Sequence, residues 1–192
     1  TLLEIWKIIE ICVDLDIIVI MQAANTGLTG GSTPYGNDYD RPVLVINTMR
    51  IEDIHIINNG KQIIGFAGST LIGLEKILAP YGREPHSVIG SSCIGASVVG
   101  GVCNNSGGAL VKRGPAYTEL ALYAKVNSKG ALELVNDLGI ELGDSPEEIL
   151  KNLQNKIYSE DQVKFPNKLA SDHSYEKRVR DVNASSPSRF NA

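Results

Sequence analysis

The stretch HSVIGSSCIGASVVGGVCNNSGG (residues 86–108) and the shorter stretch AANTGLTGGS (residues 23–32) are rich in glycine and in polar side chains. Glycine has no Cβ, so such loops let backbone N–H groups approach a phosphate closely, and Ser and Thr hydroxyls add donors. Each loop alone also suits an ordinary pair of turns, but turns do not need so many donors. Together the two loops predict a site for a dinucleotide.

Neither loop carries one of the two commonest phosphate-binding signatures. The glycines of the first loop stand at Gly27, Gly30 and Gly31, which is not the pattern G-x-G-x-x-G. In the second loop, Gly101 and Val102 stand where a P-loop needs Lys followed by Ser or Thr. The spacing therefore argues against a Rossmann or a Walker site.

The remaining sequence alternates between helical and strand patterns, which predicts an α+β fold. Turn signals at residues 58–61 and 127–130 indicate two hairpins. Ser145, Pro146 and Glu148 predict the start of a helix, with Ser145 as the capping residue. A weaker pattern indicates a short helix over residues 175–182. We expect helices over residues 2–13, 71–78 and 146–157, and strands over residues 17–20, 43–46, 54–57, 62–66, 120–126 and 131–135.

Both loops resemble the FAD-binding domain of the vanillyl-alcohol-oxidase-like, or PCMH-type, flavoproteins. Three stretches resemble one family within them, the bacterial quinone-dependent D-lactate dehydrogenases: MQAANTGLTGGSTPYGNDYDRPV (21–43), GREPHSVIGSSCIGASVVGGVCNNSGG (82–108) and KRGPAYTEL (112–120). The likeness extends over residues 2–191. It implies an incomplete PCMH-type domain built from FAD-binding type 2 subdomains. Residues 1–157 would form this domain without its N-terminal start, and residues 158–192 a polar connection toward a substrate or cap domain.

The resemblance also implies which residues bind the cofactor. Ala23 and Ala24 stand where the wider superfamily usually has glycines, so close approach of the backbone to the cofactor is less expected there than at Gly27 to Ser32. By motif position the pyrophosphate would be held by Ala23, Ala24, Asn25, Thr26, Gly27, Gly31 and Ser32. The adenosine, ribityl and flavin parts of the cofactor would be lined by Gly90, Ser97 and Gly107.

Covalent attachment of the flavin is not expected, because the family that the chain resembles binds FAD non-covalently. Cys93 and Cys103 lie in the second loop but are interpreted as packing residues, and Cys12 as a core residue. His55 is expected to face solvent or a neighbour. His86 is interpreted as structural and His173 as exposed, so no base is assigned in this chain.

The function implied by the resemblance is oxidation of D-lactate to pyruvate by hydride transfer to FAD, with electrons passed to a membrane quinone. The enzyme would sit at the cytoplasmic face of the bacterial inner membrane, and this chain alone is expected to be inactive. The alternatives are another FAD-dependent D-2-hydroxyacid dehydrogenase or oxidase, and a non-catalytic FAD-binding fragment.

Composition narrows the range of partners. At 192 residues with 43% hydrophobic residues, the chain can bury a sizeable core. A net charge of −4 argues against a nucleic-acid partner. No apolar stretch approaches the roughly twenty residues that a membrane-spanning helix needs.

Overall fold

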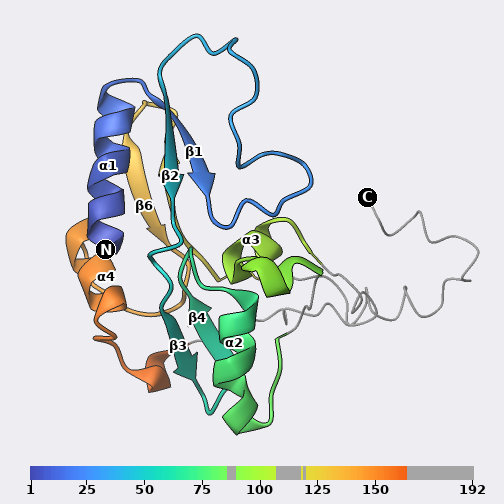
Figure 1. Cartoon of the computed structure of the whole chain (residues 1–192). Helices are drawn as coiled ribbons and strands as arrows, with labels where there is room; N and C mark the ends of the chain where they lie inside the picture. Colours follow the sequence, from blue (N-terminus) through green and yellow to red (C-terminus); the bar gives the residue numbers. More distant parts are fainter. Residues whose placement is uncertain (86–89, 107–117, 119, 164–192) are drawn as a thin grey trace, which may run out of the picture.

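The computed structural model describes residues 1–85, 90–106, 118 and 120–163, and its helices and strands agree with the α+β prediction (Figure 1). The helices are α1 Leu2–Asp14, α2 Leu71–Leu78, α3 Val98–Cys103 and α4 Pro146–Gln154, with short 3-10 turns η1 Ala79–Tyr81, η2 Gly90–Ile94 and η4 Glu160–Gln162. The strands are β1 Ile18–Gln22, β2 Val43–Asn47, β3 Ile54–Ile57, β4 Gln62–Gly65, β5 Leu122–Val126 and β6 Leu132–Asn136. The expected helix over residues 175–182 lies outside the described residues.

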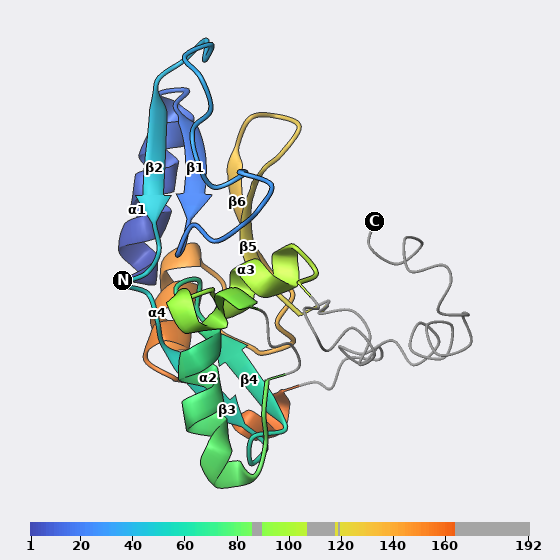
Figure 2. The same ribbon diagram turned by 45° about the vertical axis from the view of Figure 1, so that its right-hand side comes forward.

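The strands form three separate pairs. β1 and β2 run parallel, with Ile18 opposite Val43 and Gln22 opposite Asn47, whereas β3–β4 and β5–β6 are antiparallel hairpins. Because β1 and β2 are parallel, their carboxyl ends lie at the same edge, and the first glycine loop leaves from this edge. In Figures 1 and 2, α3, which belongs to the second glycine loop, lies beside the end of β1.

Local sequence signals explain both hairpins. Asn58 and Asn59 take φ angles of 52° and 54°, in the left-handed region that Asn tolerates better than most residues. In the other turn, Asn127 Oδ1 accepts hydrogen bonds from the N–H groups of Lys129 (2.8 Å) and Ala131 (3.0 Å). The two predicted hairpins are therefore confirmed.

α4 begins where the sequence predicts. Ser145 Oγ accepts a hydrogen bond from Glu148 N–H (3.2 Å), while Glu148 Oε2 accepts from Asp144 N–H (3.2 Å), one residue before the cap. The helix ends at Gln154, earlier than the predicted residue 157, because Lys156 adopts a φ of 56° that an α-helix cannot contain.

The main apolar core lies between the β3–β4 hairpin, the segment after β6, and α4. Its buried residues are Ile57, Phe66, Ile140, Leu142, Ile149, Leu153 and Val163, and Tyr158 packs against them. α1 lies along α4, and Leu2 N–H donates to Gln154 Oε1 (2.8 Å). The chain just after residue 157 thus contributes side chains to this core.

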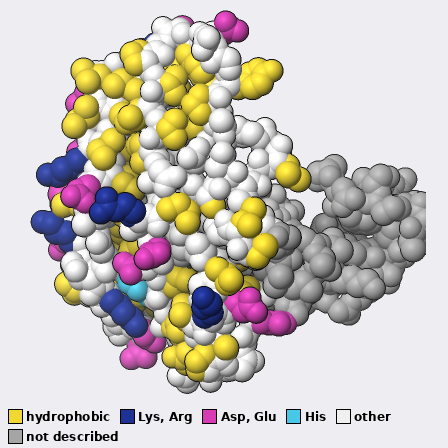
Figure 3. All heavy atoms as spheres, in the orientation of Figure 1, with side chains coloured by type: hydrophobic (Ala, Val, Ile, Leu, Met, Phe, Trp, Pro, Cys, Tyr) yellow, Lys and Arg dark blue, Asp and Glu magenta, His cyan; other side chains and the backbone are white. Residues whose placement is uncertain are grey.

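Apolar side chains also remain on the surface over α1 and the β1–β2 pair (Figure 3). Large exposed residues of these three elements are Ile8, Ile11, Met21, Leu44 and Val45. Within the described residues, no third strand pairs with β1 or β2.

Candidate functional site

The two glycine loops meet at the carboxyl edge of the β1–β2 pair. A Cβ atom placed on Gly95 would lie 3.6 Å from Ala24 Cβ and 4.0 Å from Met49 Cε. Gly95 has a φ of 96°, a conformation that side-chain-bearing residues rarely adopt. The structure therefore brings together residues of the first loop, the second loop and the segment after β2.

The first loop is folded back on itself by Asn25. This residue has a φ of 54°, and its Oδ1 accepts hydrogen bonds from Ser32 Oγ (2.8 Å) and Thr33 Oγ1 (2.7 Å). Gly30, with a φ of 72°, donates its N–H to the Gly27 carbonyl oxygen (3.4 Å). The two ends of the loop are thereby held close together.

The outer side of this loop is open and carries no formal charge. At Gly27, Gly30 and Gly31, no atom lies within 4 Å of the position that a Cβ would occupy. Residues 23–32 include no Asp, Glu, Lys or Arg, so a ligand would meet only neutral backbone and side-chain groups. An exposed glycine backbone with nearby hydroxyls fits a pyrophosphate, because bound phosphates are commonly held by such N–H groups.

The predicted residues of the first loop are accessible to different degrees. Gly27, Gly31 and Asn25 are exposed, whereas Ala23, Ala24, Thr26 and Ser32 are half-buried. The methyl group of Ala24 lies toward the second loop, so this alanine does not cover the open glycine surface.

The second loop uses its predicted serine to start a helix. Ser97 is buried, and its Oγ accepts a hydrogen bond from Gly100 N–H (3.0 Å) at the beginning of α3. The hydroxyl can still donate one hydrogen bond, since a capping hydroxyl acts only as an acceptor. Gly90 begins the turn η2, and Gly107 lies outside the described residues.

Sequence reasoning missed two polar residues at this edge, Gln22 and Asn47. Each is the last residue of an otherwise apolar strand, IVIMQ in β1 and VLVIN in β2, and this pattern is the signal that could have found them. Gln22 Nε2 donates to the Ser32 carbonyl oxygen (2.8 Å), and Asn47 Nδ2 donates to the Ala23 carbonyl oxygen (3.1 Å).

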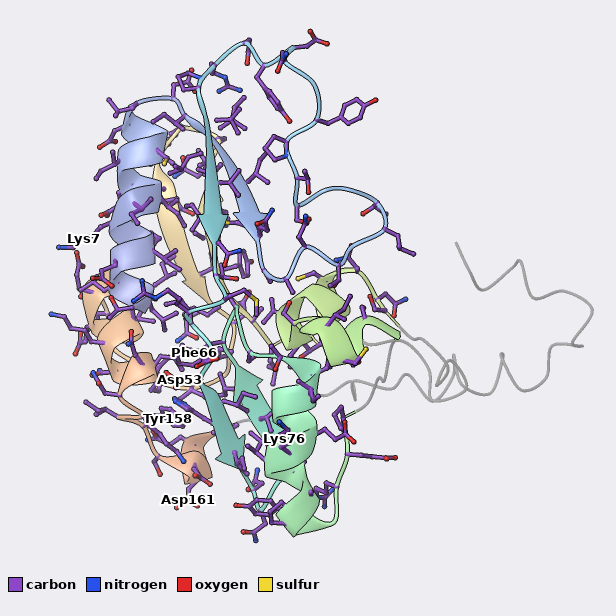
Figure 4. The ribbon with its side chains drawn as sticks, in the orientation of Figure 1. Lys7, Asp53, Phe66, Lys76, Tyr158 and Asp161 are labelled. Atoms are coloured by element: carbon purple, nitrogen blue, oxygen red, sulfur yellow. The ribbon has the colours of Figure 1, made fainter. Side chains whose placement is uncertain are left out.

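A histidine–tyrosine pair lies apart from the two loops. His55 is buried and faces neighbouring side chains, which is one of its two expected positions. Its Nδ1 is 2.8 Å from Tyr158 Oη, and its ring centroid is 5.1 Å from that of Phe66. Figure 4 labels Tyr158 and Phe66 beside Asp53, in the half of the molecule that holds β3 and β4. Burial lowers the pKa of His55, with a smaller contribution from the positive charge of Lys156, and raises the pKa of Tyr158 to about 12.

An open hollow of about 440 Å³ lies next to this pair. Lys156 and Glu160 line it, and Lys156 Nζ lies 3.4 Å from Glu160 Oε1 in an ion pair. The hollow contains no residue of either glycine loop, and its two lining charges neutralise each other. We therefore place the candidate cofactor site at the loops.

The cysteines differ in accessibility. Cys12 is buried in α1, which confirms its predicted core position. Cys93 and Cys103 are exposed, so their interpretation as packing residues is wrong. In the described part of the chain, no helix combines the length and apolar character required to cross a bilayer.

These features define an α+β protein with a loop-built candidate site at the carboxyl edge of a parallel strand pair. No family model matches the chain. Over all 192 residues the chain is 65% identical to the quinone-dependent D-lactate dehydrogenase of Haemophilus influenzae. It is 56% identical to the Escherichia coli protein and 48% identical to the Corynebacterium glutamicum protein of the same name, again over 192 residues.

The predicted resemblance to quinone-dependent D-lactate dehydrogenases is therefore confirmed along the whole chain. The chain spans 34% of the length of each of these relatives.

Proposed function

We propose that this chain is the FAD-binding part of a longer respiratory enzyme that oxidises D-lactate to pyruvate and reduces a membrane quinone. The observation that carries the proposal is the 65% identity over all 192 residues to a protein named for this activity. The convergence of the two glycine loops at Ala24 and Gly95 supports it independently.

In this proposal the open backbone of the first loop, around Gly27 and Gly31, receives the FAD pyrophosphate. The remaining first-loop residues Ala23, Ala24, Asn25, Thr26 and Ser32 shape this surface, while Gly90, Ser97 and Gly107 line the adenosine, ribityl and flavin path. Bound FAD would supply the hydride acceptor for the hydroxyl-bearing carbon of D-lactate. The groups that accept the hydroxyl proton and bind the carboxylate would come from outside this chain.

The proposal includes the architecture and location that the resemblance implies. Residues 1–157 would belong to a PCMH-type FAD-binding domain, with residues 158–192 leading toward a substrate or cap domain. FAD would be held non-covalently. The whole enzyme would be a peripheral protein at the cytoplasmic face of the bacterial inner membrane.

The test is anaerobic spectroscopy of the purified full-length gene product. D-lactate should bleach the flavin absorption bands, a soluble quinone should restore them, and NAD should not act as acceptor. L-lactate should react far more slowly, because a site that fixes both carboxylate and hydroxyl presents hydrogen to the flavin for one enantiomer only.

Several outcomes would contradict the proposal. Absence of flavin, rapid reduction by NADH, or equal rates with both lactate enantiomers would each overturn it. Faster recovery with oxygen than with quinone would indicate an oxidase, and preference for another D-2-hydroxyacid would indicate a different dehydrogenase.

A further inference from the structure

The last side chains of β1 and β2 form a hydrogen-bonded pair that reaches both ends of the first loop. Asn47 Oδ1 accepts from Met49 N–H (3.0 Å), and Asn47 Nδ2 donates to Gln22 Oε1 (3.3 Å) and to the Ala23 carbonyl oxygen (3.1 Å). Gln22 Nε2 then donates to the Ser32 carbonyl oxygen (2.8 Å). The pair therefore ties the first and last residues of the loop to the strand ends.

Backbone groups fix which way each amide points. Met49 N–H can only donate, so the oxygen of Asn47 must face it and the nitrogen must face Gln22. The Ser32 carbonyl can only accept, so the nitrogen of Gln22 must face it and the oxygen must face Asn47. A flip of either side-chain amide would place a donor against a donor, or an acceptor against an acceptor, and would break these hydrogen bonds.

The strand ends that carry this pair are themselves firmly held. Thr48 is buried, and its N–H donates to the Gln22 carbonyl oxygen (2.8 Å). Its hydroxyl lies within hydrogen-bond distance of the Gln22 (3.3 Å) and Ala67 (3.2 Å) carbonyl oxygens. The side-chain pair thus connects an exposed loop to a buried, bonded part of the backbone.

We propose that Gln22 and Asn47 are positioning residues of the cofactor site, which hold the first loop in the shape that receives the pyrophosphate of FAD. This inference rests on the proposed function. The pair acts through the loop backbone and needs no contact with the cofactor. A loop that is already ordered loses less conformational freedom on binding, so the pair would increase affinity for FAD.

The test uses Gln22→Met and Asn47→Ala in the full-length protein. Gln22→Met keeps the length of the side chain and removes its donor, and Asn47→Ala removes both donor and acceptor. The readout is the dissociation constant of FAD for the apoprotein, measured by quenching of flavin fluorescence. Each variant should raise this constant about tenfold, as expected for the loss of hydrogen bonds that order the loop. The double variant should bind about as weakly as either single variant, because both remove one connected unit.

Asn136→Ala is the matched control. Asn136 is also the last residue of a strand, its Oδ1 accepts from Leu138 N–H (3.2 Å), and its Nδ2 donates to the Ile140 carbonyl oxygen (2.9 Å). It thus has the same bonding pattern, but its partners lie outside both glycine loops. Its loss should leave FAD affinity unchanged.

The outcomes separate this inference from the proposed function. If the unsubstituted protein does not bind FAD, the proposed function fails. If it binds FAD but Gln22→Met and Asn47→Ala bind it equally well, only the positioning role is overturned. An equal loss of affinity in Asn136→Ala would also overturn that role, because it would reveal a general loss of structure.

Two further measurements distinguish loss of loop positioning from misfolding of the variant and from a direct effect on the reaction. Gln22→Leu removes the amide without adding a charge, so it should also weaken FAD binding if Gln22→Met does not fold. At saturating FAD, turnover of D-lactate should return to the unsubstituted rate. A persistent loss of kcat would contradict a role confined to positioning the loop.

Discussion

Ala24 and Gly95 lie against each other, with Ala24 Cβ only 3.6 Å from where a Cβ of Gly95 would stand. They belong to different glycine-rich loops, so this contact is where the two candidate cofactor-binding segments become one surface. The Ala24 methyl group occupies the space between the loops and leaves the outer face of the first loop open.

Replacing Gly31 with Val should abolish FAD binding without unfolding the protein. No protein atom lies within 4 Å of the added Cβ position, and Gly31, unlike Gly30, does not need a positive φ. The branched side chain would instead occupy the space proposed for the pyrophosphate. The measurement is flavin absorbance per protein after purification, together with the thermal unfolding midpoint of the apoprotein. Normal flavin content would remove Gly31 from the site.

Ser145→Ala should lower the local stability of α4 by about 1 kcal/mol, since it removes the side-chain cap at the helix start. Ser159→Ala is the matched control, because Ser159 precedes η4 without making a side-chain cap hydrogen bond. The control should change stability by less than about 0.5 kcal/mol. Amide hydrogen exchange within α4 measures the difference. Equal protection in the two variants would contradict the capping role.

His55 should make the fold less stable in mild acid. Burial lowers its pKa below the ordinary value of 6.5, so the folded state prefers neutral imidazole. This contribution is complete above about pH 6.5 and is lost as pH falls through the lower folded-state pKa. The measurement is the thermal unfolding midpoint between about pH 7.5 and pH 5, compared with His55→Gln. The substituted protein should lose less stability over this range, and parallel curves would contradict the prediction.

Tyr158 should show the opposite pH dependence. Its pKa is raised to about 12 by burial and, less strongly, by Glu160, so the folded state prefers the neutral phenol. The stability from this preference is present below the ordinary pKa of 10.0 and is lost as pH rises toward 12. Tyr158→Phe should remove the alkaline loss and, at neutral pH, cost about 1 kcal/mol for the hydrogen bond to His55. Denaturant unfolding of both proteins across this pH range is the measurement.

FAD should be released intact when the full-length protein is precipitated with acid, because the loops are proposed to hold it without a covalent bond. Cys93→Ser and Cys103→Ser should each retain the flavin content of the unsubstituted protein. Both thiols are exposed, so neither substitution should disturb a packed core. Flavin that stays with the precipitate, and that disappears in one of these variants, would identify covalent attachment.

The features that could be predicted from the sequence are those that depend on residues close together along the chain. The cap at Ser145 and the turns at Asn58 and Asn127 depend on neighbouring residues, and all three appear in the structure. The parallel pairing of β1 with β2 joins segments separated by a long loop, so periodicity could indicate each strand but not their register. The helix α3 was not predicted because VVGGVC contains two glycines, which disfavour a helix.

In the candidate site, too, local features could be predicted from the sequence and contacts between distant segments could not. Glycine and hydroxyl groups marked both loops directly in the sequence. Gln22 and Asn47 were missed because their role depends on two strands ending side by side. His55 alternates with isoleucines in β3, and it is buried beside Tyr158. The two residues are 103 positions apart, so no local sequence pattern could predict the pair.

The contact between α1 and α4 joins the first helix to one that is synthesised much later, so it can form only late during synthesis on the ribosome. The hydrogen bond from Leu2 N–H to Gln154 Oε1 joins residues 152 positions apart. At about 5–20 residues per second, synthesis takes roughly 8–30 s to span these 152 positions. During this time the side of α1 that packs on α4 has no partner, although the β3–β4 hairpin can already form. Folding of this region during synthesis therefore cannot finish before residue 154 has been added to the chain.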